Sequence, residues 1–475
     1  MGDTTSAAGT NQLRKNSLGV GAVTFLVISA AAPLTAVAGG VPISMLLGNG
    51  AGIAGTYVLV TAILLMFSVG YVAMARHISS AGGFYAFAAR GLGGRIGGAS
   101  ALIAILSYNA MQIGVLGLLG QAAGATFGIM PWWAWSFLAI ALVGILGYRQ
   151  VDLSAKILMV LVALEYLIVL IADAAIFMAG GDSGLNAQPF SMTQMNTGSP
   201  AIGILFCFAA FIGFEATTIY SEEARDPHTT VPRATYYSVI LIGVFYALTS
   251  WLMALGAGVD KLVPTLQGLP DPTTFLFDLT GRYVGGAAAQ IMGILFVSSL
   301  FAGVLAFHNG VARYKYVAGR EGILPDSVGV THDVYQSPHV GSIIQTILAV
   351  LGVGLFAVLG LDPVLNLFTW LTQVGTLGIL GLMAISSFSV IAFFGKDAMG
   401  ESALSTKILP AITGAILAIL FVYIFAKFGD LTGASGSLGV ILPSLVIVAG
   451  IIGYILAGNL AKRDPAKFAR IGANN

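Results

Sequence analysis

Two carboxylates stand inside long apolar stretches of this sequence. Glu165 lies in the run LVALEYL, and Glu215 closes the run FIGFE. A charge in apolar surroundings is costly, so such a carboxyl group can hold an exchangeable proton. Glu165 is therefore either a proton-coupling group or a neutral acid hydrogen-bonded to a neighbouring helix. Glu215 would bind an ammonium group, carry a proton or tie helices together, and we favour a gating or structural role.

Polar residues also interrupt other parts of the apolar stretches. Tyr108 and Gln112 are four residues apart, so they share a helix face that either lines a pocket or bonds neighbouring helices. His308 comes late in its stretch, where packing or an inner gate would use it. Asp173 stands near the outer end of the stretch that holds Glu165, and we expect it to reach water.

Two of the apolar stretches carry an interruption near their middle. In one, Pro33 lacks an N–H and disfavours helical geometry at the preceding residue, so a helix should stop near Ala31 and restart with the proline in its first turn. In the other, Gly213 stands close to Glu215. A broken helix frees N–H and C=O groups, and paired breaks indicate a transporter site. The alternative is a kink at Pro33 and close packing at Gly213.

The predicted binding site follows from these breaks and from the polar face. Phe208 and Phe211 flank the second break, where they would either pack or gate. We predict that the substrate contacts Ser29, Ala31, Ala32, Leu34, Thr35, Tyr108, Gln112, Phe208, Ala209, Phe211, Ile212 and Gly213. The predicted proton-coupling residues are Glu165 and Glu215. We expect no cofactor and no metal site, and the chain has neither an HExxH motif nor a GxxxxGK[ST] loop.

The composition is that of a membrane protein. The 475 residues are 57% hydrophobic and only 9% charged, whereas soluble domains carry about 25% charged residues. So few charges cannot cover a water-facing surface, but a lipid-facing surface needs none. The 62 glycines allow membrane helices to pack closely. The net charge of +1 indicates no nucleic-acid partner.

The sequence offers twelve stretches that approach the roughly 20 apolar residues of a membrane span. They are Ser17–Leu47, Gly52–Ala75, Gly97–Phe127, Trp132–Tyr148, Leu153–Met178, Pro200–Tyr220, Ala234–Gly258, Gly285–Ala312, Val340–Leu359, Pro363–Phe394, Thr406–Lys427 and Leu438–Leu460. The breaks fall in the first and sixth, which correspond if the first ten spans are two repeats of five.

The placement of charges gives the orientation. With the N-terminus in the cytoplasm, 18 of the 21 Lys and Arg residues lie in inner segments, where such residues accumulate. Segment 271–283 then lies outside and has the pattern of a short amphipathic lid helix. The predicted organisation is a cytoplasmic tail at 1–16, repeats at 17–178 and 200–394, two additional spans at 406–460, and a cytoplasmic tail at 461–475.

Three motifs resemble those of the amino acid–polyamine–organocation superfamily. They are SAGGFY at 80–85, GFE with the following SEEARDP and VPRA at 213–234, and ARY with GREGILP at 312–325. The resemblance implies a five-plus-five inverted repeat, alternating access, and a site between spans one, three, six, eight and ten. We therefore expect an all-α integral membrane protein of about twelve transmembrane helices with helices 1 and 6 broken.

The sequence departs from the family pattern in places that bear on substrate and coupling. Amino acid carriers of the family have a Gly-Ser/Ala-Gly run at the first break, whose N–H groups hold the substrate carboxylate. Here the run is AAP at 31–33, and Pro33 has no N–H. Many members have a coupling-linked lysine where this chain has Glu165, and Asp226 replaces the usual Asn. Ser298 and Ser299 stand where sodium-coupled relatives of the fold have hydroxyl ligands.

The sequence thus predicts a secondary transporter of the cell (plasma) membrane that moves an amino acid or organic amine, coupled to protons. Two buried acids without a matching buried base favour an amine-bearing solute. The expected partners are this solute, protons and the lipid bilayer. An amine exchanger, a channel and a non-transporting sensor remain alternatives. The GDSG run at 181–184 lies in a predicted outer loop without a histidine beside it, which argues against an intramembrane protease.

Overall fold

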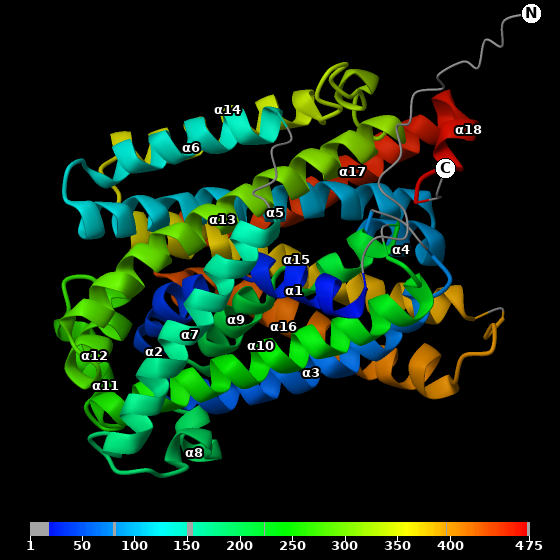
Figure 1. Ribbon diagram of the computed structural model, residues 1–475. Coiled ribbons are helices and arrows are strands. Elements are labelled where there is room, and N and C mark those ends of the chain that lie inside the picture. The colour runs from blue at the N-terminus through cyan, green and yellow to red at the C-terminus, as the bar shows by residue number, and fades with distance from the viewer. Residues whose placement is uncertain (1–18, 79–81, 150–154, 223, 396, 473–475) are drawn as a thin grey trace, which may run out of the picture.

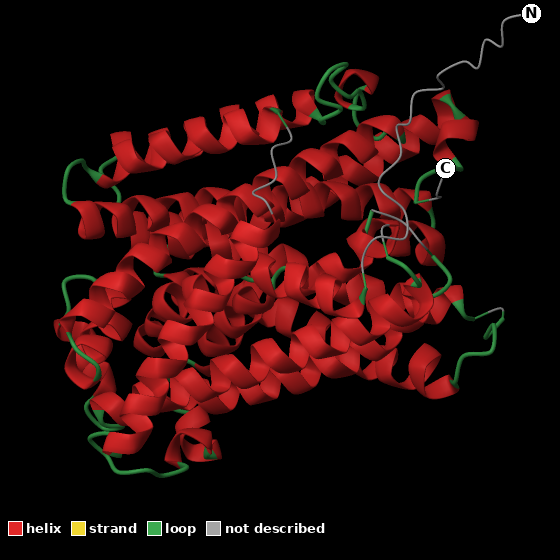
Figure 2. Ribbon diagram, viewed as in Figure 1, coloured by secondary structure: helices red, strands yellow, loops and turns green. Residues whose placement is uncertain are grey.

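The structure is a computed structural model that describes residues 19–78, 82–149, 155–222, 224–395 and 397–472. The predicted tail at 1–16 lies outside these residues, as do Ser80 and Ala81 of the first motif and Glu223 of the second. The described residues form helices joined by loops, and no β-strand occurs among them (Figure 2).

The elements follow one another along the chain, where η denotes a short 3-10 or π helix. Up to the end of the fifth predicted span, the chain contains α1 (Val20–Ala30), η1 (Thr35–Gly40), α2 (Val41–Leu47), η2 (Gly50–Gly52), α3 (Ile53–Ala75), α4 (Phe84–Leu92), α5 (Gly94–Phe127), α6 (Trp132–Tyr148) and α7 (Ala155–Ala179). The remainder contains η3 (Gln188–Phe190), α8 (Met192–Met195), α9 (Pro200–Phe211), η4 (Phe214–Glu222), α10 (Pro227–Ala257), α11 (Leu262–Gly268), η5 (Pro272–Thr274), α12 (Phe275–Tyr283), α13 (Gly286–Arg320), η6 (Asp326–Val328), α14 (His339–Val358), η7 (Pro363–Phe368), α15 (Thr369–Phe393), η8 (Leu404–Ile408), α16 (Leu409–Thr432), α17 (Leu438–Arg463) and α18 (Pro465–Phe468).

The predicted spans correspond to helical segments. Within the described residues, 10 helices are long and apolar enough to cross a membrane. The other two predicted spans are α6, a shorter apolar helix, and the interrupted first span of α1, η1 and α2. Helices satisfy their backbone hydrogen bonds internally, which is why a lipid environment selects them. Two helices extend well beyond their predicted bounds: α13 continues to Arg320 instead of ending near Ala312, and α10 begins at Pro227 instead of Ala234.

The helices pack through small residues and leave apolar faces on the outside. The long helix α5 contacts α13, α15 and α17, while α10 lies along α3. Gly98 of α5 and Gly453 of α17 meet closely, because a Cβ atom on Gly98 would lie 2.8 Å from the Gly453 carbonyl oxygen. On α14 and α16, residues such as Val358 and Ile419 are exposed, as expected of helices that face lipid.

The two ends of the bundle differ in what covers them (Figure 1). Helices α4 and α18 lie at one end, and α8, α11 and α12 lie at the other. The predicted short helix within 271–283 is present as α12. It is tied to the loop after α7, where Arg282 Nη2 lies 2.6 Å from Asp182 Oδ1. The hydrogen-bonded guanidinium holds the pKa of Asp182 below its usual value.

Candidate functional site

The first span is broken where Pro33 predicts it. Helix α1 ends at Ala30, and helical structure resumes at Pro33. Between them Ala32 has a φ of 44°, a left-handed conformation that is uncommon for a residue with a side chain. The Ala32 N–H donates to Ser29 O at 3.1 Å, and the Ala32 carbonyl accepts from Ala36 N at 3.1 Å. The prediction of a stop near Ala31 and a restart at Pro33 is confirmed.

The sixth span is broken at the predicted glycine. Helix α9 ends at Phe211, and the chain resumes as the 3-10 helix η4 at Phe214. Gly213 has a φ of 116°, which only glycine adopts without strain. Each break is therefore a short turn in which one residue with a positive φ interrupts the hydrogen-bond ladder of a membrane helix.

A cavity lies between the two breaks. Its room for the centres of water molecules is about 60 Å³, several times the roughly 10–15 Å³ that one water needs. The lining residues come from spans one, three, six, eight and ten, the five that the family resemblance implies. They are Ala31, Ala32, Thr35, Ala36, Gly40, Met111, Val115, Phe206, Ala209, Ala210, Ile212, Gly303, Phe307, Phe368, Thr372 and Gln373.

Five of the residues predicted to bind substrate line this cavity: Ala31, Ala32, Thr35, Ala209 and Ile212. The other seven residues of the predicted set do not line it. Within the first span, the Ser29 hydroxyl donates to the Phe25 carbonyl at 2.8 Å, and Leu34 is fully buried.

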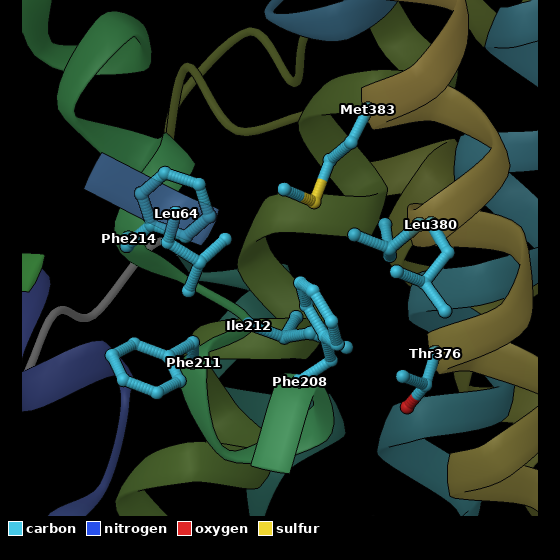
Figure 3. A pocket seen from close by; sticks show the side chains of 9 residues that line it. Leu64, Phe208, Phe211, Ile212, Phe214, Thr376, Leu380 and Met383 are labelled. Carbon is cyan, nitrogen blue, oxygen red and sulfur yellow. The ribbon is translucent and has the colours of Figure 1, made fainter. Parts of the chain in front are cut away.

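The aromatic residues at the second break line a separate, narrow pocket. Phe208 and Phe211 surround a space of about 10 Å³ with side chains from α3 and α15 (Figure 3). The ring of Phe211 also lies 6.4 Å from Tyr57 and 5.9 Å from Tyr246, measured between centroids. This space holds about one water. The two rings therefore pack beside the second break. Ile212 lies between them and the larger cavity, because it lines both spaces.

Glu165 is buried and reaches the first break through two contacts. The Ser299 hydroxyl donates to Glu165 Oε2 at 2.8 Å, and the backbone N–H of Leu34 interacts with the same carboxylate. Thr35 in turn donates to Ser299 at 3.2 Å. Because Thr35 lines the cavity, a hydrogen-bonded path of two side chains joins Glu165 to the space where a solute would lie. Glu165 forms no ion pair with any described residue.

Glu215 is buried at the second break. Its Oε2 accepts the N–H of Gly213 at 2.9 Å, and its Oε1 accepts the hydroxyl of Tyr108. Tyr71 of α3 donates to the backbone carbonyl of Glu215 at 3.3 Å. Tyr108 is thus a partner of this carboxylate and does not line the cavity. The contacts fasten the broken span to α3 and α5, the helix-tying arrangement among the three roles considered for Glu215.

A buried polar chain joins α5, α13 and α14; the sequence reasoning named its members Gln112 and His308 but missed Lys315 and Gln345. Lys315 is buried and donates from Nζ to Gln345 Oε1 at 2.5 Å, and Gln345 Nε2 donates to Gln112 Oε1. Gln112 Nε2 lies 3.4 Å from His308 Nδ1, whose other ring nitrogen lies 2.8 Å from the Ser342 hydroxyl. His308 and Lys315 are seven residues apart, which places them on one helical face.

Two expectations about charge are wrong. Asp173 does not reach water: it is 2% exposed, and Thr249 donates to its Oδ2 at 2.8 Å because α10 covers α7 at this level. The premise that the membrane region has no buried base also fails, because Lys315 is buried. It lies eight residues beyond Phe307, the last residue of α13 that lines the cavity, or about 12 Å along the helix. The expectation that the solute carries an amine must therefore rest on the residues of the cavity.

Thr372 and Gln373 of α15 are cavity residues that the sequence reasoning also missed. The Thr372 hydroxyl donates to the Phe368 carbonyl at 2.7 Å. Gln373 is fully buried, and its Oε1 has no hydrogen-bond partner. The available indication was a polar pair in the apolar run WLTQVGTL of the tenth span.

Paired breaks around a central cavity, in a bundle of this kind, define a multi-pass membrane permease. The amino acid permease family profile matches residues 18–457. The chain therefore belongs to this family, within the amino acid–polyamine–organocation superfamily.

Curated relatives and solved structures agree with this assignment. A low-affinity putrescine importer of Escherichia coli is 24% identical over 61% of this chain, a match that spans only 64% of the importer's length. A branched-chain amino acid permease of Bacillus subtilis is 26% identical over 80% of this chain and 83% of its own length. A manganese transporter of Eremococcus coleocola has a TM-score of 0.59 at 14% identity, covering 98% of this chain and 99% of its own, a likeness of fold.

Filling the cavity should block solute uptake without unfolding the protein. Ala209 lies in regular helix α9 and lines the cavity, so Ala209→Trp places an indole where the solute would lie. We expect uptake into proteoliposomes to fall at least about tenfold. Ala141→Trp, on the exposed face of α6, is the matched control and should retain uptake. Unchanged uptake by a well-folded Ala209→Trp protein would remove this cavity from the transport path.

Proposed function

We propose that the protein is a secondary active transporter that moves an amino acid or organic amine across the cell membrane by alternating access, coupled to protons. The observation that carries this proposal is the cavity between the two helix breaks, lined by spans from both halves of the fold. The putrescine importer and the branched-chain amino acid permease among the relatives support a small amine-bearing solute.

The breaks supply a place where the two halves of the fold can move relative to each other. Both turns lack the continuous hydrogen-bond ladder that stiffens a helix, and both adjoin the cavity. Rocking of one repeat against the other would open the same cavity to either side in turn. The solute shifts the balance between the two states only as far as it binds them differently.

Glu165 is the proposed proton carrier. Its carboxylate is an acceptor for Ser299, and Ser299 is an acceptor for the cavity residue Thr35. A proton on Glu165 turns one carboxylate oxygen into a donor, so the direction of hydrogen bonds along this path can change. Because the path joins spans one, five and eight, protonation would favour one arrangement of these spans over the other.

The Glu165 proposal predicts a specific defect. Glu165→Gln keeps the size and an acceptor oxygen but cannot exchange a proton. We expect proteoliposomes with this variant to lose accumulation driven by an inward proton gradient and to retain solute exchange. Asp173→Asn is the matched control, because Asp173 is a buried acid of the same helix that contacts Thr249 instead of the break. If Glu165→Gln accumulates solute with the gradient dependence of the parent, Glu165 is not the coupling group and Glu215 becomes the next candidate.

We propose that both termini lie in the cytoplasm. The support is the distribution of Lys and Arg. Reporter domains fused separately to the two termini should respond only to cytoplasmic reagents in intact cells. A response of either fusion to an impermeant external reagent would contradict this orientation.

A further inference from the structure

In both broken spans, the C-terminal helix end before the break faces the cavity, whereas the N–H groups after the break face a carboxylate. Helix α1 ends at its C-cap Ala31, and α9 ends at its C-cap Ile212; both C-caps line the cavity. The C-terminal end of a helix carries unpaired carbonyl groups and the negative end of the helix dipole. The cavity therefore receives two negative helix ends, one from each repeat.

The N-terminal sides of the breaks are covered by the protein's own carboxylates. Glu165 interacts with the N–H of Leu34 where the first span resumes, and Glu215 accepts the N–H of Gly213 just before η4. Free N–H groups at such ends are where a substrate carboxylate would be held. In this protein both N–H groups already have an acidic partner. Glu165 of α7 pairs with Leu34, and Glu215 of the sixth span pairs with Gly213 in the same span.

Most side-chain donors in the cavity wall are also engaged. Thr35 donates to Ser299, Thr372 donates to the carbonyl of Phe368, and Gln373 Nε2 donates to Thr372 Oγ1 at 3.5 Å. The free group is an acceptor, Oε1 of the fully buried Gln373. Of the described residues that line the cavity, none is charged, and the remainder are apolar. A ligand that donates hydrogen bonds fits this wall better than one that needs donors, because the second N–H of the Gln373 amide is the side-chain donor left among the described lining residues.

We infer that the substrate is an amine cation that carries no carboxylate and has a largely apolar body. This inference rests on the proposed transport function and narrows its substrate class. The ammonium group would lie between the carbonyl ends at Ala31 and Ile212, within reach of Gln373. The Ala31 carbonyl already accepts the Tyr246 hydroxyl at 3.4 Å and has a second lone pair for the ammonium group. An amino acid would bring a carboxylate that must either displace Glu165 or Glu215 or remain unpaired beside them, and both alternatives weaken binding.

Matched pairs of solutes test this inference, because decarboxylation removes only the group in question. The pairs are putrescine and ornithine, cadaverine and lysine, and isoamylamine and leucine. Each labelled compound is offered separately to proteoliposomes that contain the full-length protein. We expect at least one amine to be taken up with an apparent KM at least about tenfold below that of its parent amino acid.

The outcomes separate the inference from the proposed function. Uptake of a parent amino acid with an apparent KM equal to or below that of its amine would overturn the inference and leave transport standing. If no member of any pair is taken up, the proposed function fails, and the inference fails with it.

A variant tests the cause of the selectivity. Glu165→Ala exposes the N–H of Leu34, so the preference for the amine over its parent should shrink several-fold in the Kd values of the purified protein. Binding is measured because this variant also lacks the proposed coupling group. Asp173→Ala, the matched control, should keep the preference. An unchanged preference in Glu165→Ala would overturn the assignment of selectivity to the covered helix ends.

Discussion

A helix that is broken inside a membrane leaves backbone groups that lipid cannot satisfy. In this protein the breaks at Ala32 and Gly213 leave such groups at two places, and carboxylate side chains pair with them at both. Carboxylates cover N–H groups where the spans resume, while the carbonyl ends of α1 and α9 meet a cavity. The polarity of the site, its proposed preference for a cation and the position of the proposed proton carrier all follow from this arrangement.

The carboxylates also connect the breaks to the rest of the bundle. Glu165 brings α7 and, through Ser299, α13 to the first break. Glu215 brings α5 to the second break through Tyr108. A change in the protonation of either group is therefore felt by helices that belong to both halves of the fold. The polar chain from Lys315 to His308 adjoins the cavity wall, because Gln112 and His308 directly follow the lining residues Met111 and Phe307.

The sequence predicted the features that depend on local chemistry. Proline at 33 and glycine at 213 set the breaks, and runs of apolar residues set the spans, because both effects act over a few neighbouring residues. It did not predict contacts that depend on how helices face one another. Tyr108 meets Glu215 across 107 residues of sequence, and Asp173 is buried where α10 packs against α7. Hydropathy alone also predicted an end of the eighth span near Ala312, eight residues before the end of α13, and so placed Lys315 in a loop.

The central claim is that the carbonyl ends of the broken helices hold the solute while the acidic residues hold the N–H ends. An experimental structure of the protein in lipid nanodiscs, determined with a bound amine, tests it most directly. The account predicts an ammonium nitrogen within hydrogen-bonding distance of carbonyl groups at Ala31 and Ile212, with Glu215 still on the N–H of Gly213. Solute density outside this cavity, or a solute group in place of Glu165 at the N–H of Leu34, would contradict it.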